Sequence, residues 1–168
     1  MVLLALQIFA CSDDKGTTNQ APKLSLLDLE VVRNELKNYD SLLLLKLQYL
    51  DENGDLGLKE SDTFGSFKYG EPHFNNLLCY WYVKKEGKWV RPLNPFSNPV
   101  DSLNFNERLP YLTPEGRNKR LEGEITLRIP ARPLGLIFDT VKMQVWMLDR
   151  ALNKSNTIET KEFYIKHP

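Results

Sequence analysis

The sequence predicts an all-β sandwich of about seven strands in one domain. Between residues 24 and 168, short apolar runs are separated by turn residues at fairly even spacing, which is typical of such a fold. Two of the runs alternate apolar and polar side chains, as strands with one buried face do. The chain has 168 residues, of which 42% are hydrophobic, so it is long enough to bury a core of its own.

The first half of the domain supplies four of the expected strands. Residues 24–39 have an apolar spacing that also fits a helix, but a strand is expected because the other segments are strand-like. Residues 41–50, "SLLLLKLQYL", are rich in strand-compatible side chains. Residues 76–92 are predicted to form two strands joined at Glu86-Gly87, because such a pair between apolar runs is a hairpin signal.

The second half supplies the remaining strands. Residues 103–112 are a weaker candidate, because Pro110 has no backbone N–H and confines a strand to an edge or ends it. Residues 159–167 are expected to form the last strand. In the alternating runs 120–129 and 140–149, the predicted inward faces consist of Leu121, Ile125, Leu127 and Ile129 in the first and Val141, Met143, Val145 and Met147 in the second.

The N-terminal segment "MVLLALQIFAC" divides the chain into three parts. Its apolar run is shorter than the roughly 20 residues that span a bilayer, but it fits the core of a signal peptide. Residues 1–10 are therefore predicted to be a signal peptide, and 11–23 to be a lipidated Cys11 with a flexible polar tether. Residues 24–168 are then the folded domain. The alternative is that the apolar run is a frayed terminus or a first core strand.

Several short motifs resemble those of a known class of protein. Ile8-Phe9-Ala10-Cys11 resembles a bacterial lipobox, which implies cleavage before the cysteine and a lipid attached to it. Ser12-Asp13-Asp14 resembles the acidic signal of Bacteroidetes-type surface lipoproteins. The stretches "LDENGDLGL" (50–58) and "LDRALNKSN" (148–156) are similar to strand ends of bacterial immunoglobulin-like domains.

This resemblance to surface lipoproteins with an immunoglobulin-like domain implies a location and a broad role. The expected location is the outer membrane, with the lipid as anchor and the domain exposed at the cell surface. The periplasmic face is the alternative. Proteins of this kind serve adhesion, complex assembly and glycan capture alike, so the resemblance implies a non-catalytic binding or assembly role without naming the partner.

The stretch "DENGDLGLKESD" (51–62) raises the question of calcium. Counted as an EF-hand-type loop, Asp51, Asn53 and Asp55 occupy positions one, three and five, and Asp62 occupies position twelve. Leu56 stands where that loop needs glycine, and the flanking segments are predicted to be strands. The two interpretations are a calcium loop of another kind and a tight turn with solvated acids.

The predicted strand order brings a second loop to the same place. In an immunoglobulin-like sandwich, the loops 51–73 and 149–156 lie at one end of the domain. Asp149 and Asn153 are therefore candidates to face the acidic loop, with Asp149 as a further tentative calcium ligand. The alternative is that the two residues only close a hairpin through hydrogen bonds to the backbone.

Composition and motifs exclude some functional classes. Lys+Arg and Asp+Glu both total 22, so the net charge is zero, and no basic stripe predicts nucleic-acid binding. No zinc spacing, nucleophile elbow or phosphate-binding loop is present, so no enzyme is predicted, and a small hydrolase is the least favoured alternative. The expected partner is an unidentified protein or glycan. A glycan-binding accessory lipoprotein of a polysaccharide-uptake system would use exposed aromatic side chains, here Trp81, Trp89 and Trp146, and Asn153 is a further candidate binding residue.

Overall fold

The computed structural model describes residues 20–97, 101–113 and 119–168, so the predicted signal peptide and Cys11 lie outside the described residues. Ten strands are present in these ranges. They are β1 (Lys23–Asn34), β2 (Tyr39–Asp51), β3 (Leu77–Lys85), β4 (Lys88–Val90), β5 (Leu93–Asn94), β6 (Asp101–Ser102), β7 (Leu121–Pro130), β8 (Thr140–Met147), β9 (Ile158–Glu159) and β10 (Phe163–Tyr164). Two short 3-10 turns, η1 (Gly65–Phe67) and η2 (Pro133–Gly135), complete the secondary structure.

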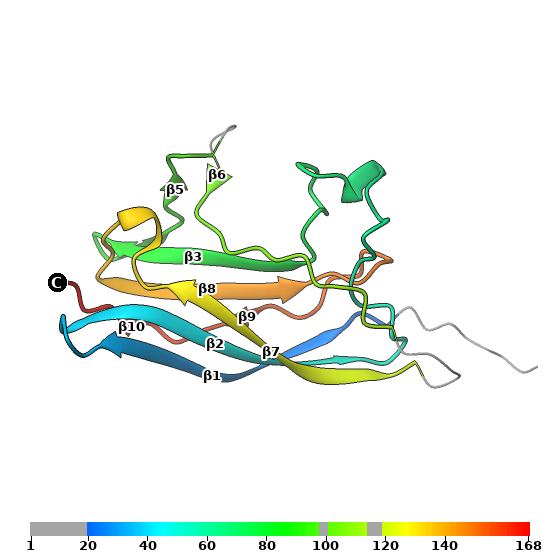
Figure 1. Cartoon of the computed structure of the whole chain (residues 1–168), viewed down its shortest axis with the longest axis horizontal. Coiled ribbons are helices and arrows are strands. Elements are labelled where there is room, and N and C mark those ends of the chain that lie inside the picture. Colours follow the sequence, from blue (N-terminus) through cyan, green and yellow to red (C-terminus); the bar gives the residue numbers. More distant parts are fainter. Residues whose placement is uncertain (1–19, 98–100, 114–118) are drawn as a thin grey trace, which may run out of the picture.

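Eight of the strands form two antiparallel sheets that lie over one another, and β5 and β6 form a separate two-stranded ribbon (Figure 1). One sheet has the order β1-β2-β7, and the other has the order β10-β8-β3-β4, with β9 also paired to β8. Two antiparallel sheets that pack over one another in this way make an all-β sandwich. The predicted all-β sandwich is therefore confirmed. It has ten strands rather than about seven, partly because the predicted last strand is divided into β9 and β10.

The core lies between the two sheets, where the alternating faces meet. Leu43, Leu45 and Leu47 of β2 are fully buried. They pack in one cluster with the inward side chains of β3 and β8. Truncating one of these leucines to alanine is expected to cost about 2–5 kcal/mol. The predicted inward face of β8 is confirmed, since Val141, Met143, Val145 and Met147 are each 0% exposed.

A bulge in β1 explains why the apolar spacing of this segment also fits a helix. It pairs with β2 along its whole length, but the register shifts between Leu26 and Asp28, so Leu27 is an extra, unpaired residue. Such a bulge breaks the period of two that identifies a strand. Leu24 and Leu29 consequently face the core from positions five residues apart.

The segment 103–112 is an irregular edge rather than a strand. The backbone N–H groups of Phe105 and Glu107 donate to the carbonyls of Cys79 and Leu77, at 2.7 and 2.8 Å. Isolated antiparallel bridges also join Asn104 to Tyr80 and Glu107 to Leu77. The segment therefore lies beside β3 and extends the second sheet without forming a regular strand.

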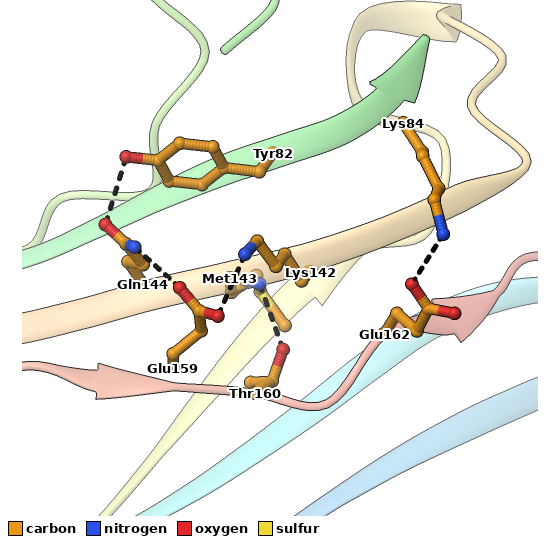
Figure 2. Close-up of polar contacts among 8 residues, drawn as sticks. All are labelled: Tyr82, Lys84, Lys142, Met143, Gln144, Glu159, Thr160 and Glu162. Atoms are coloured by element: carbon orange, nitrogen blue, oxygen red, sulfur yellow. Dashed lines mark hydrogen bonds and ion pairs between the residues drawn. The ribbon is translucent and has the colours of Figure 1, made fainter. Parts of the chain in front are cut away.

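A polar network secures the last strands to the second sheet (Figure 2). The Tyr82 hydroxyl donates to Gln144 at 3.0 Å, and the Gln144 amide donates to Glu159 at 2.7 Å. Lys142 adds an ion pair with Glu159 at 2.8 Å. The hydrogen bond from Gln144 and the nearby Lys142 lower the pKa of Glu159.

Among the described residues, no helix is long and apolar enough to cross a membrane.

Candidate functional site

The loop after β2 and the turn after β8 meet at one end of the sandwich. Leu56 forms an antiparallel bridge with Asp149, and the backbone N–H of Arg150 donates to the Asp55 carbonyl at 3.2 Å. The strand order predicted that these two loops would be neighbours, and the structure places them in contact. This end of the domain therefore gathers the acidic residues that the sequence singled out.

Two glycines hold the acidic loop tightly against its surroundings. Gly54 and Gly57 have φ values of +63° and +85°, which other residues rarely adopt. A Cβ atom at Gly54 would come within 1.7 Å of the Lys119 carbonyl oxygen. At Gly57 it would come within 1.8 Å of the Pro110 carbonyl oxygen. Only glycine fits at either position, so the backbone that carries the acidic side chains is fixed by packing.

The side-chain oxygens of the loop are buried without partners. Asp51 is 0% exposed, and neither of its carboxylate oxygens has a hydrogen-bond partner. The Oδ1 atoms of Asn53 and Asp55 are also buried and unpaired. Buried polar atoms are satisfied in the great majority of cases, and an unpaired buried carboxylate is especially costly. These four oxygens are therefore available to a cation.

The pKa values of the loop acids reflect this environment. Burial raises the pKa of Asp51, as does the charge of Asp149, while the backbone N–H groups of Gly54, Leu56 and Asp55 act in the opposite direction. Those amides favour the ionised carboxylate, although neither of its oxygens has a partner that meets hydrogen-bond criteria. Burial also raises the pKa of Asp55, and the charges of Asp149 and Asp51 add to the effect. The three carboxylates thus share one poorly solvated region.

Asp149 and Asn153 close the turn after β8. The Asn153 backbone N–H donates to Asp149 Oδ1 at 2.8 Å, and its side-chain amide donates to Asp149 Oδ2 at 2.7 Å. This is the hairpin-closing role that the sequence left as the alternative. Each carboxylate oxygen of Asp149 keeps a second lone pair, so the turn does not exhaust its capacity as a ligand.

Asp62 lies outside this group of acids. Its Oδ2 atom accepts a hydrogen bond from the Lys59 backbone N–H at 2.8 Å, which closes a local turn. Its charge does not contribute to the pKa shifts of Asp51 and Asp55. The structure therefore gives Asp62 a different role from the twelfth-position ligand that the loop count suggested. In the described ranges, no three histidine, cysteine, aspartate or glutamate side chains are arranged to hold a metal ion as they stand.

The three tryptophans occupy different environments. Trp81 is fully buried, with its ring 5.6 Å from that of Phe105, so its prediction as a surface binding residue was wrong. The physical reason is the strand period, which places Trp81 on the inward face with Cys79 and Val83. Trp89 and Trp146 are half-buried on the outer face of the second sheet.

Cations lie over the outer-face rings. Trp146 stacks on Tyr80 with ring centroids 5.0 Å apart, and the Lys154 ammonium lies 4.2 Å from the Trp146 ring centroid. Lys142 is 4.8 Å from the ring centroid of Trp89. These contacts stabilise the rings where they are, by about 0.5–1 kcal/mol each at such exposed positions. A ligand would have to displace the cations before it could stack on these tryptophans.

Sequence reasoning missed a groove on the outer face of β3. Figure 1 shows that the loop carrying η1 and the β5–β6 ribbon both stand on this side of the strand. The space they border has a volume of about 770 Å³. Its lining includes three aromatic rings and three amides, namely Tyr69, Phe74, Tyr80, Asn75, Asn104 and Asn106. These residues come from segments far apart in the sequence, so no motif could have identified them.

Comparison of the chain with protein-family models, with curated proteins and with solved structures gives no match. A function is therefore inferred from the residues of the two regions themselves.

Proposed function

We propose that this chain is a non-catalytic binding domain of the cell envelope, anchored by a lipid on Cys11, and that it takes its ligand in the groove over β3. The observation that carries the binding role is the groove itself, with its volume of about 770 Å³ and its aromatic and amide lining. The anchor and the surface location rest on the N-terminal motifs of the sequence.

The lining of the groove favours a neutral carbohydrate as the ligand. Tyr69 is 83% exposed and packs edge-on against Phe74, with centroids 5.1 Å apart, so it offers an apolar face at the edge of the groove. Aromatic rings can contact the C–H faces of a sugar, and amides can donate to and accept from its hydroxyls. Glycan binding by aromatic side chains is the second candidate function that the sequence suggested, here with different aromatic residues and with amides beside them.

The polar side chains of the groove are suited to hydroxyl groups. The Oδ1 atom of Asn106 accepts the Cys79 backbone N–H at 2.9 Å, which fixes the amide and leaves its nitrogen as a donor. Within the described part of the chain, the side chain of Asn75 makes no hydrogen bond. Among the described residues, Glu71 and Asp101 also line the groove, while Arg91 lies 4.0 Å from the Tyr80 ring centroid and Arg108 lies 5.0 Å from that of Phe74. Tyr69 is therefore the ring most open to a sugar, and the two carboxylates of the lining disfavour acidic ligands.

A binding screen with matched variants tests this proposal. The probes are immobilised neutral and acidic oligosaccharides, and the variants are Tyr69→Ala and Asn75→Ala. The control is Tyr164→Ala, which removes a tyrosine that is 64% exposed on β10 and outside the groove. We expect neutral oligosaccharides to bind the unaltered chain and the control, and each groove variant to bind at least about tenfold more weakly, which corresponds to 1.4 kcal/mol. Failure of every neutral probe, or binding that survives both groove variants, would contradict the proposal.

A further inference from the structure

We infer that the end of the sandwich where β2 and β8 finish is a calcium site, with Asp51, Asn53 and Asp55 as side-chain ligands and Asp149 completing the set. The site is separate from the groove over β3, and it does not depend on the proposed carbohydrate ligand.

The first support is the unpaired oxygen set. Asp51 is fully buried, and both of its carboxylate oxygens lack a partner. The Oδ1 atoms of Asn53 and Asp55 are buried and unpaired in the same loop, at alternate positions along the chain. A carboxylate in such a position is expected to be paired or to coordinate a metal. A bound cation would satisfy all four oxygens at once.

The second support is the local charge. Three carboxylates lie close together: the charge of Asp149 acts on Asp51, and the charges of both act on Asp55. Arg150 is the cation that acts on Asp55, but its guanidinium donates to the Thr113 hydroxyl at 2.8 Å and lies 4.3 Å from the Tyr111 ring centroid. Three ionised carboxylates and one guanidinium give the cluster a net charge of −2. A divalent cation would cancel it.

The third support is the constraint on the loop backbone. Gly54 and Gly57 are pressed against the carbonyls of Lys119 and Pro110, so the segment from Asp51 to Gly57 cannot simply open to hydrate its acids. The bridge from Leu56 to Asp149 keeps the second loop against it. Because packing holds the backbone in place, we expect the carboxylates to reach a bound cation by rotation of their side chains.

The ligand chemistry selects calcium over other metals. The candidate ligands are carboxylate and amide oxygens, which suit hard cations, and no histidine or cysteine is among them. Calcium accepts six to eight oxygens in irregular geometry, with water and backbone carbonyls completing the shell. Magnesium demands near-ideal octahedral geometry. The carboxylates are not yet gathered around one point, so the adaptable ion fits better.

The experiment is thermal unfolding of the full chain, in calcium-free buffer and with calcium added, together with calorimetric titration of calcium. We expect calcium to raise the Tm, with a dissociation constant no weaker than about 10⁻³ M, as in extracellular calcium modules. Magnesium at the same concentration should raise it less. The matched control Asp62→Ala should behave like the unaltered chain, because Asp62 belongs to its own turn.

Two ligand variants make the result specific. Asp51→Asn and Asp55→Asn keep the shape of the side chain and remove one charge each. We expect both to lose the calcium-dependent rise in Tm and to bind calcium at least about tenfold more weakly. In calcium-free buffer, Asp51→Asn should melt no lower than the unaltered chain, because it removes an unpaired buried charge. The same Tm with and without calcium, combined with no heat of calcium binding, would overturn the inference, as would an undiminished rise in Asp55→Asn.

Discussion

Leu56 and Asp149 form an antiparallel bridge that joins the loop after β2 to the turn after β8. This single backbone contact connects residues that are 93 positions apart along the chain. It brings the buried Asp51 and the half-buried Asp55 close enough to Asp149 for its charge to act on both. From its sequence alone, the acidic loop is also compatible with a simple surface turn. In the structure it is part of a poorly solvated cluster with an excess of negative charge.

The first prediction concerns the glycine that presses the acidic loop against its neighbour. Gly54→Ala should lower the free energy of unfolding by at least about 3 kcal/mol, because it combines a positive φ with a backbone clash at Lys119. Gly70→Ala is the control, since Gly70 also has a positive φ of +86° but nothing lies within 4 Å of its added Cβ. That control should lose only about 1–2 kcal/mol. Chemical denaturation measures both, and equal losses would show that the close packing of the loop is not real.

The second prediction concerns the pH dependence of the calcium-free protein. The folded-state pKa values of Asp51 and Asp55 are raised above their ordinary value of 3.8, so the folded state binds these protons more tightly than the unfolded state does. The stability that these two acids contribute is fully present below pH 3.8 and is lost as the pH rises through their raised folded-state pKa values. The double variant Asp51→Asn, Asp55→Asn should remove this part of the pH dependence. Denaturation midpoints between about pH 4 and about pH 7 measure it. An identical pH profile for the double variant would refute this account of the two acids.

The third prediction concerns the buried thiol of β3. Burial raises the pKa of Cys79 to about 12, so almost no reactive thiolate is present at neutral pH. An alkylating reagent should leave Cys79 unmodified in the folded protein and modify it readily in denaturant. Mass spectrometry of the peptide that contains Cys79 measures the difference without interference from Cys11. Comparable modification rates in the two states would mean that β3 is not part of a stable core.

The fourth prediction concerns the lipid anchor. Cys11→Ser should abolish incorporation of labelled fatty acid and shift the protein from the membrane fraction to the soluble fraction in a bacterial host that processes lipoproteins. Cys79→Ala is the matched control, because it removes the other cysteine and leaves Cys11 in place. The control should keep both the label and the membrane location. Retention of the label by Cys11→Ser would place the lipid elsewhere.

The sequence predicted strands correctly where apolar and polar side chains alternate with the strand period of two. The alternation in 140–149 identified the inward face of β8, because a strand buries every second residue. The hairpin at Glu86-Gly87 was likewise predictable, and both residues have positive φ values. In β1 the bulge at Leu27 interrupted the alternation and left helix and strand equally compatible with the spacing.

The candidate sites show where sequence reasoning ends. The meeting of the acidic loop with Asp149 followed from the strand order, but the burial of the unpaired Asp51 oxygens depends on the packing of the whole loop, which no residue pattern encodes. The groove was missed for a related reason. Tyr69 and Asn106 are brought together only because the irregular segment 103–107 lies beside β3.

The most direct test of the calcium site is a calcium titration followed by the amide NMR signals of the full chain. A calcium ion bound at this site should shift signals mainly in residues 51–57 and 149–153, with the signals of Gly54 and Asp149 among those that move most. The signals of Asp62 and of the groove residue Asn75 should change little. An absence of shifts at saturating calcium, or shifts centred on Asp62 rather than on Asp51, would contradict the site described above.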